Sequence, residues 1–98
     1  MKKQEVISRL QKHEDEIRAS GISNLYLFGS HARDEARQDS DIDLFFDRAP
    51  GTQVGVFKLL GLQHRLEEIL GAKVDLAIRE GLHYVLRPDI EQSATQIF

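Results

Sequence analysis

The segment Asp41–Asp47 alternates between two kinds of side chain, and this period of two restricts the fold more than any other feature of the sequence. An extended strand here would carry Ile42, Leu44 and Phe46 on one face and Asp41, Asp43 and Phe45 on the other. Aspartate is disfavoured in strands, so two aspartates on one face, about 6.6 Å apart along the chain, need a compensating interaction. We therefore expect a sheet with one apolar face and one face that carries charge.

The residues before this strand predict a helix, a strand and a short helix. Apolar residues at helical spacing within Gln4–Ser20 predict the first helix, which Gly21 would end. His13 falls where the apolar stripe should continue, so packing is thin at that point. The run Leu25–Phe28 predicts a buried strand, and Ala32–Gln38 favours a short helix after it.

The residues after it alternate between helical and extended patterns. Arg48–Gln53 reads as a loop, Val56–Leu70 as the clearest helix and Lys73–Ile78 as a strand, while Gly81–Arg87 is ambiguous. The helix face expected to pack inward comprises Val56, Leu59, Leu62, Leu66, Ile69 and Leu70. Pro88 suits the first turn of a last helix, whose packing residues would be Leu86, Ile90, Ala94 and Ile97. This order predicts an α/β or α+β fold, a small mixed sheet of three or more strands flanked by helices.

Composition narrows the class of protein. The chain has 98 residues, so residues 1–98 are expected to form one domain. Its 16 acidic and 13 basic residues, net −3, argue against direct nucleic-acid binding, which requires a basic excess or stripe. The absence of cysteine excludes disulfides and thiolate chemistry. No apolar run approaches the roughly 18 residues of a membrane span and no signal peptide is apparent, so we expect a soluble, cytoplasmic protein.

Three features carry possible chemistry, and each has a simpler structural explanation. Gly29-Ser30 could bind a phosphate through main-chain N–H groups and a hydroxyl, or could simply form a turn and a helix N-cap. Asp41 and Asp43 could bind a divalent metal together with nucleotide phosphates, or could be solvated at a strand end. Asp75 lies opposite the apolar face of a later strand, where a surface aspartate is also common. Considered one at a time, the structural explanations are favoured.

The combination resembles a known family. The chain reads Phe28-Gly29-Ser30-His31-Ala32-Arg33-Asp34 and then Ser40-Asp41-Ile42-Asp43-Leu44, with a third acid at Asp75 on a later strand. This pattern resembles the minimal nucleotidyltransferases (MNT) of the DNA polymerase beta-like superfamily, and the likeness extends from the first helix to the Pro88 helix. The family usually has glycine where this chain has Asp34. Aspartate tolerates a positive φ better than most residues, so we expect the departure to affect nucleotide affinity rather than the fold.

The resemblance implies a nucleotidyltransferase palm-like fold and a role for each matching residue. Asp41 and Asp43 would hold two Mg²⁺ ions that bind ATP, and Asp75 would bind the metal next to the attacking hydroxyl and help to deprotonate it. The nucleotide-binding residues would be Gly29, Ser30, Arg33 and Ser40. Arg33 could instead pair with an acid that orders its loop. If Asp75 were not the third carboxylate, Asp47 on the same strand face as Asp43 would be the first alternative.

The resemblance also implies a partner. Minimal nucleotidyltransferases resemble antitoxins that add AMP to a tyrosine of a HEPN-domain ribonuclease toxin, which would make this chain a Mg²⁺-dependent protein adenylyltransferase. One alternative is a catalytically weak module that neutralises a HEPN partner by binding it; another is transfer to a small molecule. Apolar residues around Phe57 and Tyr84 are candidates for a binding surface. The four histidines show no metal-ligand spacing, and we expect His31 to be solvated.

Overall fold

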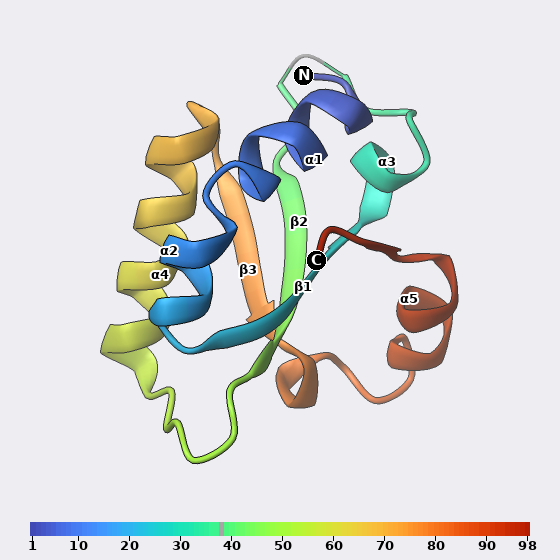
Figure 1. Cartoon of the computed structure of the whole chain (residues 1–98). Helices are drawn as coiled ribbons and strands as arrows, with labels where there is room; N and C mark the ends of the chain where they lie inside the picture. The colour runs from blue at the N-terminus through green and yellow to red at the C-terminus, as the bar shows by residue number, and fades with distance from the viewer. Residues whose placement is uncertain (38) are drawn as a thin grey trace.

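The computed structural model describes residues 1–37 and 39–98 and contains a four-stranded sheet with the order β3-β2-β1-β4 (Figure 1). The elements are α1 (Lys3–Gln11), α2 (Glu14–Ala19), β1 (Ile22–Phe28), α3 (Gly29–Ala32), β2 (Ile42–Arg48), α4 (Val56–Leu70), β3 (Val74–Ile78), the 3-10 turn η1 (Arg79–Gly81), α5 (Arg87–Ser93) and β4 (Thr95–Gln96). Strand β1 pairs antiparallel with β2 and β4, whereas β2 pairs parallel with β3. The predicted mixed sheet flanked by helices is confirmed.

The two faces of the sheet are covered differently. Helices α1, α2 and α4 lie on one side, and α5 lies on the other (Figure 1). The buried core includes Val6, Leu10, Ile17, Leu27, Ile42, Leu44, Phe46, Leu62, Leu66, Leu70, Val74 and Leu76. In β2 the period-two pattern is realised as predicted, because Ile42, Leu44 and Phe46 join this core and Asp43 faces the other side. Within the described part of the chain, no helix has the length and apolar character needed to cross a membrane.

The predicted first helix is two helices, because the chain leaves helical geometry at His13. Val6 and Leu10 anchor α1 in the core and Ile17 anchors α2, but no apolar residue at the break holds that turn against the sheet. The His13 ring instead contacts the Arg9 carbonyl at 3.0 Å. The polar residues that interrupt the apolar stripe therefore divide the predicted helix into two, rather than only reducing its packing against the sheet.

The strand β1 begins three residues earlier than predicted, at Ile22. Ile22 is buried and pairs with Arg48, and a register shift follows between Ile22 and Asn24. Polar Ser23 and Asn24 concealed this part of the strand in the sequence. The preceding Gly21 ends α2 with a φ of 109°, which fits its predicted role as a helix terminator.

The short helix predicted over Ala32–Gln38 is wrong in position. Helix α3 is Gly29–Ala32, and the chain turns at Arg33 and Asp34 instead of continuing, while Gln38 lies outside the described residues. Asp34 has a φ of 58°, a left-handed conformation that Asp tolerates better than most side chains. The departure from glycine at this position is therefore accommodated by the fold.

The last helix starts as predicted and ends early. Pro88 lies in the first turn of α5, but the helix stops at Ser93, whose hydroxyl donates to the Asp89 carbonyl at 2.9 Å. Thr95 and Gln96 then pair with β1 as β4, and Ile97 is buried as an extension of that strand. The prediction that Ala94 and Ile97 belong to the last helix is therefore wrong.

Two side chains expected to pack inward are exposed: Val56 is 71% exposed and Leu86 is 56% exposed. Val56 is the first residue of α4, whereas Leu62, Leu66 and Leu70 further along the helix are buried. The predicted inward face of this helix is therefore correct from Leu59 to Leu70 and wrong at Val56.

Helix α4 also blocks the outer edge of the sheet. Strand β3 is an edge strand, and its outward N–H groups at Val74 and Leu76 donate to Glu67 Oε2 (3.0 Å) and Gln63 Oε1 (3.3 Å). Unpaired N–H groups on an edge strand are a template for aggregation. The two α4 side chains therefore satisfy the strand and disfavour the addition of another strand.

We expect the double substitution Gln63→Ala with Glu67→Ala to destabilise the protein by about 1 to 3 kcal/mol, because two strand N–H groups lose their partners. The variant should also self-associate faster through the exposed edge. Chemical denaturation and light scattering would measure the two effects. Glu68→Ala, an exposed neighbour on the same helix, is the control, and equal behaviour of the two variants would contradict the role of the edge contacts.

Candidate active site

Two carboxylates from neighbouring strands meet on the sheet face opposite the main core. Asp43 on β2 lies in register with Asp75 on β3, and on its other side Asp43 pairs with Phe28 of β1. Neighbouring residues in register point to the same face, so the two acids stand side by side. Asp43 is half-buried and Asp75 is exposed. Of the three predicted acids, this pair is the one that the strand pairing brings together.

The main chain of Gly29 lies directly against Asp43. Gly29 has a φ of 73°, and a Cβ built on it would overlap Asp43 Oδ2 and lie 3.1 Å from Asp43 Cγ. Only glycine fits both the backbone conformation and the space. The Gly29-Ser30 turn is therefore held next to the carboxylate pair, as the motif predicts.

The carboxylates carry unbalanced negative charge. Burial of Asp43 raises the pKa of its carboxyl, the like charges of Asp75 and Asp41 raise it further, and the Arg33 guanidinium lowers it in part. Arg33 also donates from Nε to Glu35 Oε2 at 3.2 Å, with both side chains exposed. The positive charge of Arg33 thus acts on Asp43, and its side chain pairs with Glu35 in its own loop. The structure is therefore compatible with both predicted roles, phosphate binding and ordering of the loop.

Asp41 differs from its prediction as a strand residue. The strand β2 begins at Ile42, whose N–H donates to the Lys73 carbonyl at 2.9 Å, and Asp41 precedes this first bond and is exposed. Ser40 accepts a hydrogen bond from the Arg37 N–H at 3.0 Å and so organises the loop before the strand. Asp41 and Ser40 line a cleft of about 410 Å³ together with Asp39, Gly71, Ala72 and Lys73.

The carboxylates fit a metal ion whose remaining ligands come from a bound phosphate. They do not form a complete set of protein ligands. Among the described residues, no group of three or more His, Cys, Asp or Glu side chains is arranged to hold a metal ion. Asp43 and Asp75 supply two carboxylates, and Mg²⁺ commonly binds one or two carboxylates plus substrate phosphates. Burial and then the like charges of Asp75 and Asp41 raise the pKa of Asp43, and a cation bound between the carboxylates would relieve the repulsion part of this effect.

His31 is buried rather than solvated, so the sequence expectation was wrong. It is 2% exposed, its Nδ1 has no hydrogen-bond partner among the described residues, and burial lowers the pKa of its imidazole. The α3 helix directs this side chain inward together with Ala32, immediately after Ser30. A position inside a four-residue helix gives too short a pattern for the inward direction to be predicted.

The charged sheet face also holds a cluster that the sequence analysis missed. Arg79 donates to both carboxylate oxygens of Asp47 (2.6 and 3.0 Å) and to Glu91 of α5 (2.5 Å). Its guanidinium lies over the rings of Tyr26 and Phe45, at 4.8 and 5.0 Å from their centroids. The hydrogen bonds with Asp47 raise the pKa of Arg79 far above its usual range. Because both carboxylate oxygens of Asp47 accept hydrogen bonds from Arg79, the alternative of Asp47 as third carboxylate is disfavoured.

Comparison with known proteins identifies the family. Residues 10–97 match the model of the nucleotidyltransferase domain. The chain belongs to the nucleotidyltransferase domain family. This nucleotidyltransferase is 35% identical to protein adenylyltransferase MntA of Thermococcus cleftensis over 82 residues, which covers 81% of this chain and 79% of the relative.

Solved structures show the same fold. A protein provisionally described as a minimal nucleotidyltransferase superposes with a TM-score of 0.80 at 30% identity, over 97% of this chain and 95% of that one. An MNT antitoxin in complex with a tri-AMPylated HEPN toxin of Shewanella oneidensis has a TM-score of 0.65 at 20% identity, over 90% of this chain and 68% of that one. The first of these confirms the predicted family, and the second supports the fold.

We expect Gly29→Ala to abolish nucleotidyl transfer and to destabilise the protein more than Gly51→Ala does. Both glycines have a positive φ, 73° and 78°, so each variant incurs the left-handed penalty of about 1 to 2 kcal/mol. Only Gly29 would also push a Cβ into Asp43, since a Cβ at Gly51 meets nothing within 4 Å. Thermal denaturation and activity assays compare the pair, and equal losses in both would show that the contact with Asp43 is unimportant.

We also expect Asp43→Asn to stabilise the metal-free protein at neutral pH by about 0.2 to 1 kcal/mol, because it removes one of two like charges in register. The folded-state pKa of Asp43 is raised, so the cost of its ionisation is absent below the ordinary aspartate pKa of 3.8 and develops as pH rises through the folded value. The gain should therefore disappear in acid. Unfolding measured in a chelator from pH 3 to 7 tests this, and destabilisation at pH 7 would contradict it.

Proposed function

We propose that this nucleotidyltransferase transfers AMP from ATP to a hydroxyl of a HEPN-domain protein and thereby acts as an antitoxin. The observation that supports this most strongly is the Asp43–Asp75 pair, held in register with the Gly29 main chain packed against Asp43. The fold comparison with an MNT antitoxin bound to an AMPylated HEPN toxin is consistent with the same partner class. Tyrosine is the expected acceptor.

Each residue would have a distinct role. Gly29 and Ser30 would hold the triphosphate through main-chain N–H groups and the Ser30 hydroxyl, with Arg33 balancing phosphate charge and Ser40 ordering the loop beside the nucleotide. Asp41, Asp43 and Asp75 would hold Mg²⁺ with the phosphates, and two ions are expected. When bound, Mg²⁺ would neutralise charge on the reacting phosphate and orient the attacking and leaving oxygens.

The chemical step balances with Asp75 as the proton acceptor. The acceptor oxygen bonds to the α-phosphorus of ATP, and the bond from that phosphorus to the bridging oxygen of the β-phosphate breaks. Pyrophosphate leaves with the electron pair, and the hydroxyl proton passes to Asp75. Asp75 is suited to this because it is exposed on an edge strand, where a large acceptor can approach.

A second function has specific support. Asp41 lies outside the strand, and the described acids do not form a ready three-carboxylate cluster. A nucleotidyltransferase fold that neutralises a HEPN partner by complex formation, with weak catalysis, would tolerate this arrangement.

We assign residues 1–98 to one nucleotidyltransferase domain, because one cluster of buried residues joins α1 to the C-terminal Ile97. We place the reaction in the cytoplasm, where ATP is available and where a chain without cysteine needs no oxidising environment.

The test is Asp75→Asn incubated with MgATP and the HEPN-domain protein of the same genome. Wild-type protein should raise the intact mass of that partner by one or more AMP units. The variant should keep MgATP binding and lose transfer by at least about 10²-fold, because general-base catalysis contributes 10² to 10⁴. Mass spectrometry of the partner and calorimetry of MgATP binding measure the two properties.

Asp15→Asn, an exposed aspartate on α2 at the other side of the sheet, is the matched control and should transfer AMP at the wild-type rate. Transfer at that rate by Asp75→Asn would contradict the role of Asp75. Neutralisation of the toxin without any change in its mass, by wild type and variant alike, would establish the binding function instead.

A further inference from the structure

Three consecutive apolar side chains are exposed between η1 and α5. Tyr84, Val85 and Leu86, here the apolar loop, are 82%, 59% and 56% exposed. The main chain of this loop is ordered by His83, whose carbonyl accepts from the Leu86 N–H (3.0 Å) and the Arg87 N–H (2.9 Å). An ordered segment that exposes contiguous apolar surface is typical of a contact site, because little conformational entropy is lost when a partner binds it.

The apolar loop lies on the reacting side of the sheet. Arg79, which follows β3, lies over Tyr26 and Phe45 on the face that carries Asp43, and it also bonds to Glu91 of α5. Helix α5 and the loop that leads into it are thus anchored on that face, as Figure 1 shows by their separation from α4. Asp75 is the second residue of β3 and the loop follows the other end of that strand, so about 10 Å of strand and the turn η1 separate them (Figure 1).

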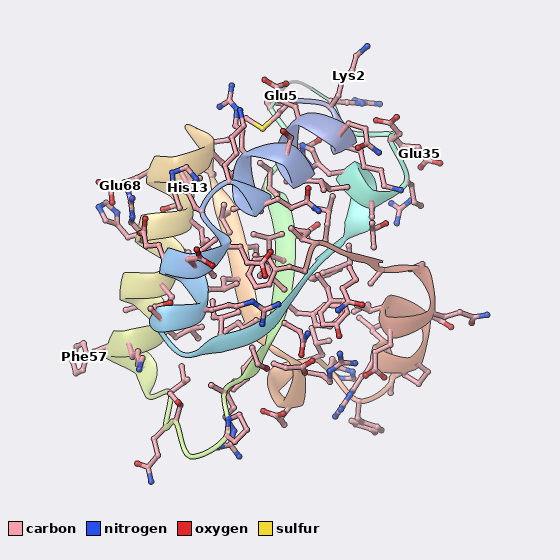
Figure 2. The ribbon with its side chains drawn as sticks, in the orientation of Figure 1. Lys2, Glu5, His13, Glu35, Phe57 and Glu68 are labelled. Carbon is pink, nitrogen blue, oxygen red and sulfur yellow. The ribbon has the colours of Figure 1, made fainter. Side chains whose placement is uncertain are left out.

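A second apolar patch is on the opposite side. Val56 (71% exposed) and Phe57 (90% exposed) begin α4, which packs against the core face of the sheet. Figure 2 shows the Phe57 side chain extending from the outer side of α4, away from the sheet. A protein whose hydroxyl reaches Asp75 would not contact this patch in the same encounter.

The surroundings of the apolar loop favour a basic partner. Glu80 and Asp89 flank it and are exposed, and among the described residues neither forms an ion pair. The nearby cations are occupied, since Arg79 pairs with Asp47 and Glu91, and Arg87 pairs with Glu91 at 3.4 Å. With Asp75 further along the same side, this surface is negatively charged. A partner that presents a positively charged surface would complement it.

We propose that the apolar loop and its acidic flanks form the docking surface for the protein that receives AMP. This inference rests on the proposed function and specifies where the acceptor is held. A standard interface covers about 800 Å² of each partner, a disc of about 16 Å radius, which is wide enough to join Asp75 to the segment after β3. Tyr84 is the central anchor, because exposed aromatic residues dominate the binding energy of such contacts.

The experiment compares two matched pairs of substitutions. Tyr84→Ser with Val85→Ser removes two of the three apolar side chains of the loop, and Phe57→Ser with Val56→Ser removes an aromatic and a valine that are somewhat more exposed on the far side. The HEPN-domain protein of the same genome is the probe. Its dissociation constant is measured by calorimetry and its KM in the transfer assay, with MgATP affinity and thermal stability recorded for every variant.

The loop variant should raise the dissociation constant and KM for the HEPN protein by about tenfold or more. MgATP affinity, thermal stability and kcat at saturating HEPN protein should stay at wild-type values. The α4 variant should match wild type in all of these properties. Wild-type binding should also weaken as salt rises, because complementary charges are screened.

Wild-type values for the loop variant, or an equal loss in the α4 variant, would overturn the docking surface and leave the proposed function intact. Binding by wild type that is insensitive to salt would overturn the role of the acidic flanks. Absence of both binding and AMP transfer in the wild type would instead refute the proposed function.

Discussion

The parallel pairing of β2 with β3 is the constraint on which the site depends. It places Asp43 beside Asp75 and leaves Asp41 just before the first bond of the ladder. Helix α4 connects the two strands, and Gly71, in a left-handed conformation with a φ of 65°, ends the helix and lets the chain turn into β3. The apolar stripe of α4 thus packs this connection against the core, while the carboxylate pair lies on the far side of the sheet.

The Asp43–Asp75 pair destabilises the protein when no ligand is bound. Its charges repel, burial disfavours the ionised form of Asp43, and Arg33 is the cation that opposes this effect. The arrangement is consistent with a site built for a ligand that brings positive charge, since perturbed carboxyl groups concentrate where function requires them. At the C-terminal end of β3, on the same face, Arg79 supplies a positive charge beside the carboxylates. It bonds to Asp47 and Glu91 and lies over two aromatic rings. One sheet face therefore holds a part in which Arg79 is paired with carboxylates and a part in which the Asp43–Asp75 pair carries unbalanced negative charge.

Features with a strong local signal could be predicted from the sequence. The alternation in β2, the stripe of α4 and the glycine before Ser30 each depend on side chains close in sequence, and each is found in the structure. Elements that depend on distant partners could not be predicted. Strand β4 is two residues long and exists because Leu27 pairs with Thr95, and the inward direction of His31 is set by packing beneath α3. The Arg79 cluster joins β1, β2 and α5, so no single segment of sequence contains it. Asp41 shows the limit most clearly: its alternation with Ile42 and Asp43 is real, but strand pairing begins one residue later.

We propose that this site cleaves ATP between its α- and β-phosphates and transfers the adenylyl group to a protein. The most direct measurement uses ATP labelled at the α-phosphate or, in a parallel reaction, at the γ-phosphate, with wild-type protein and the HEPN-domain protein of the same genome. Label from the α-phosphate should become covalently attached to the HEPN protein, and label from the γ-phosphate should leave with pyrophosphate. Attachment of the γ-label, or release of the α-label as free nucleotide with no labelled HEPN protein, would contradict the account.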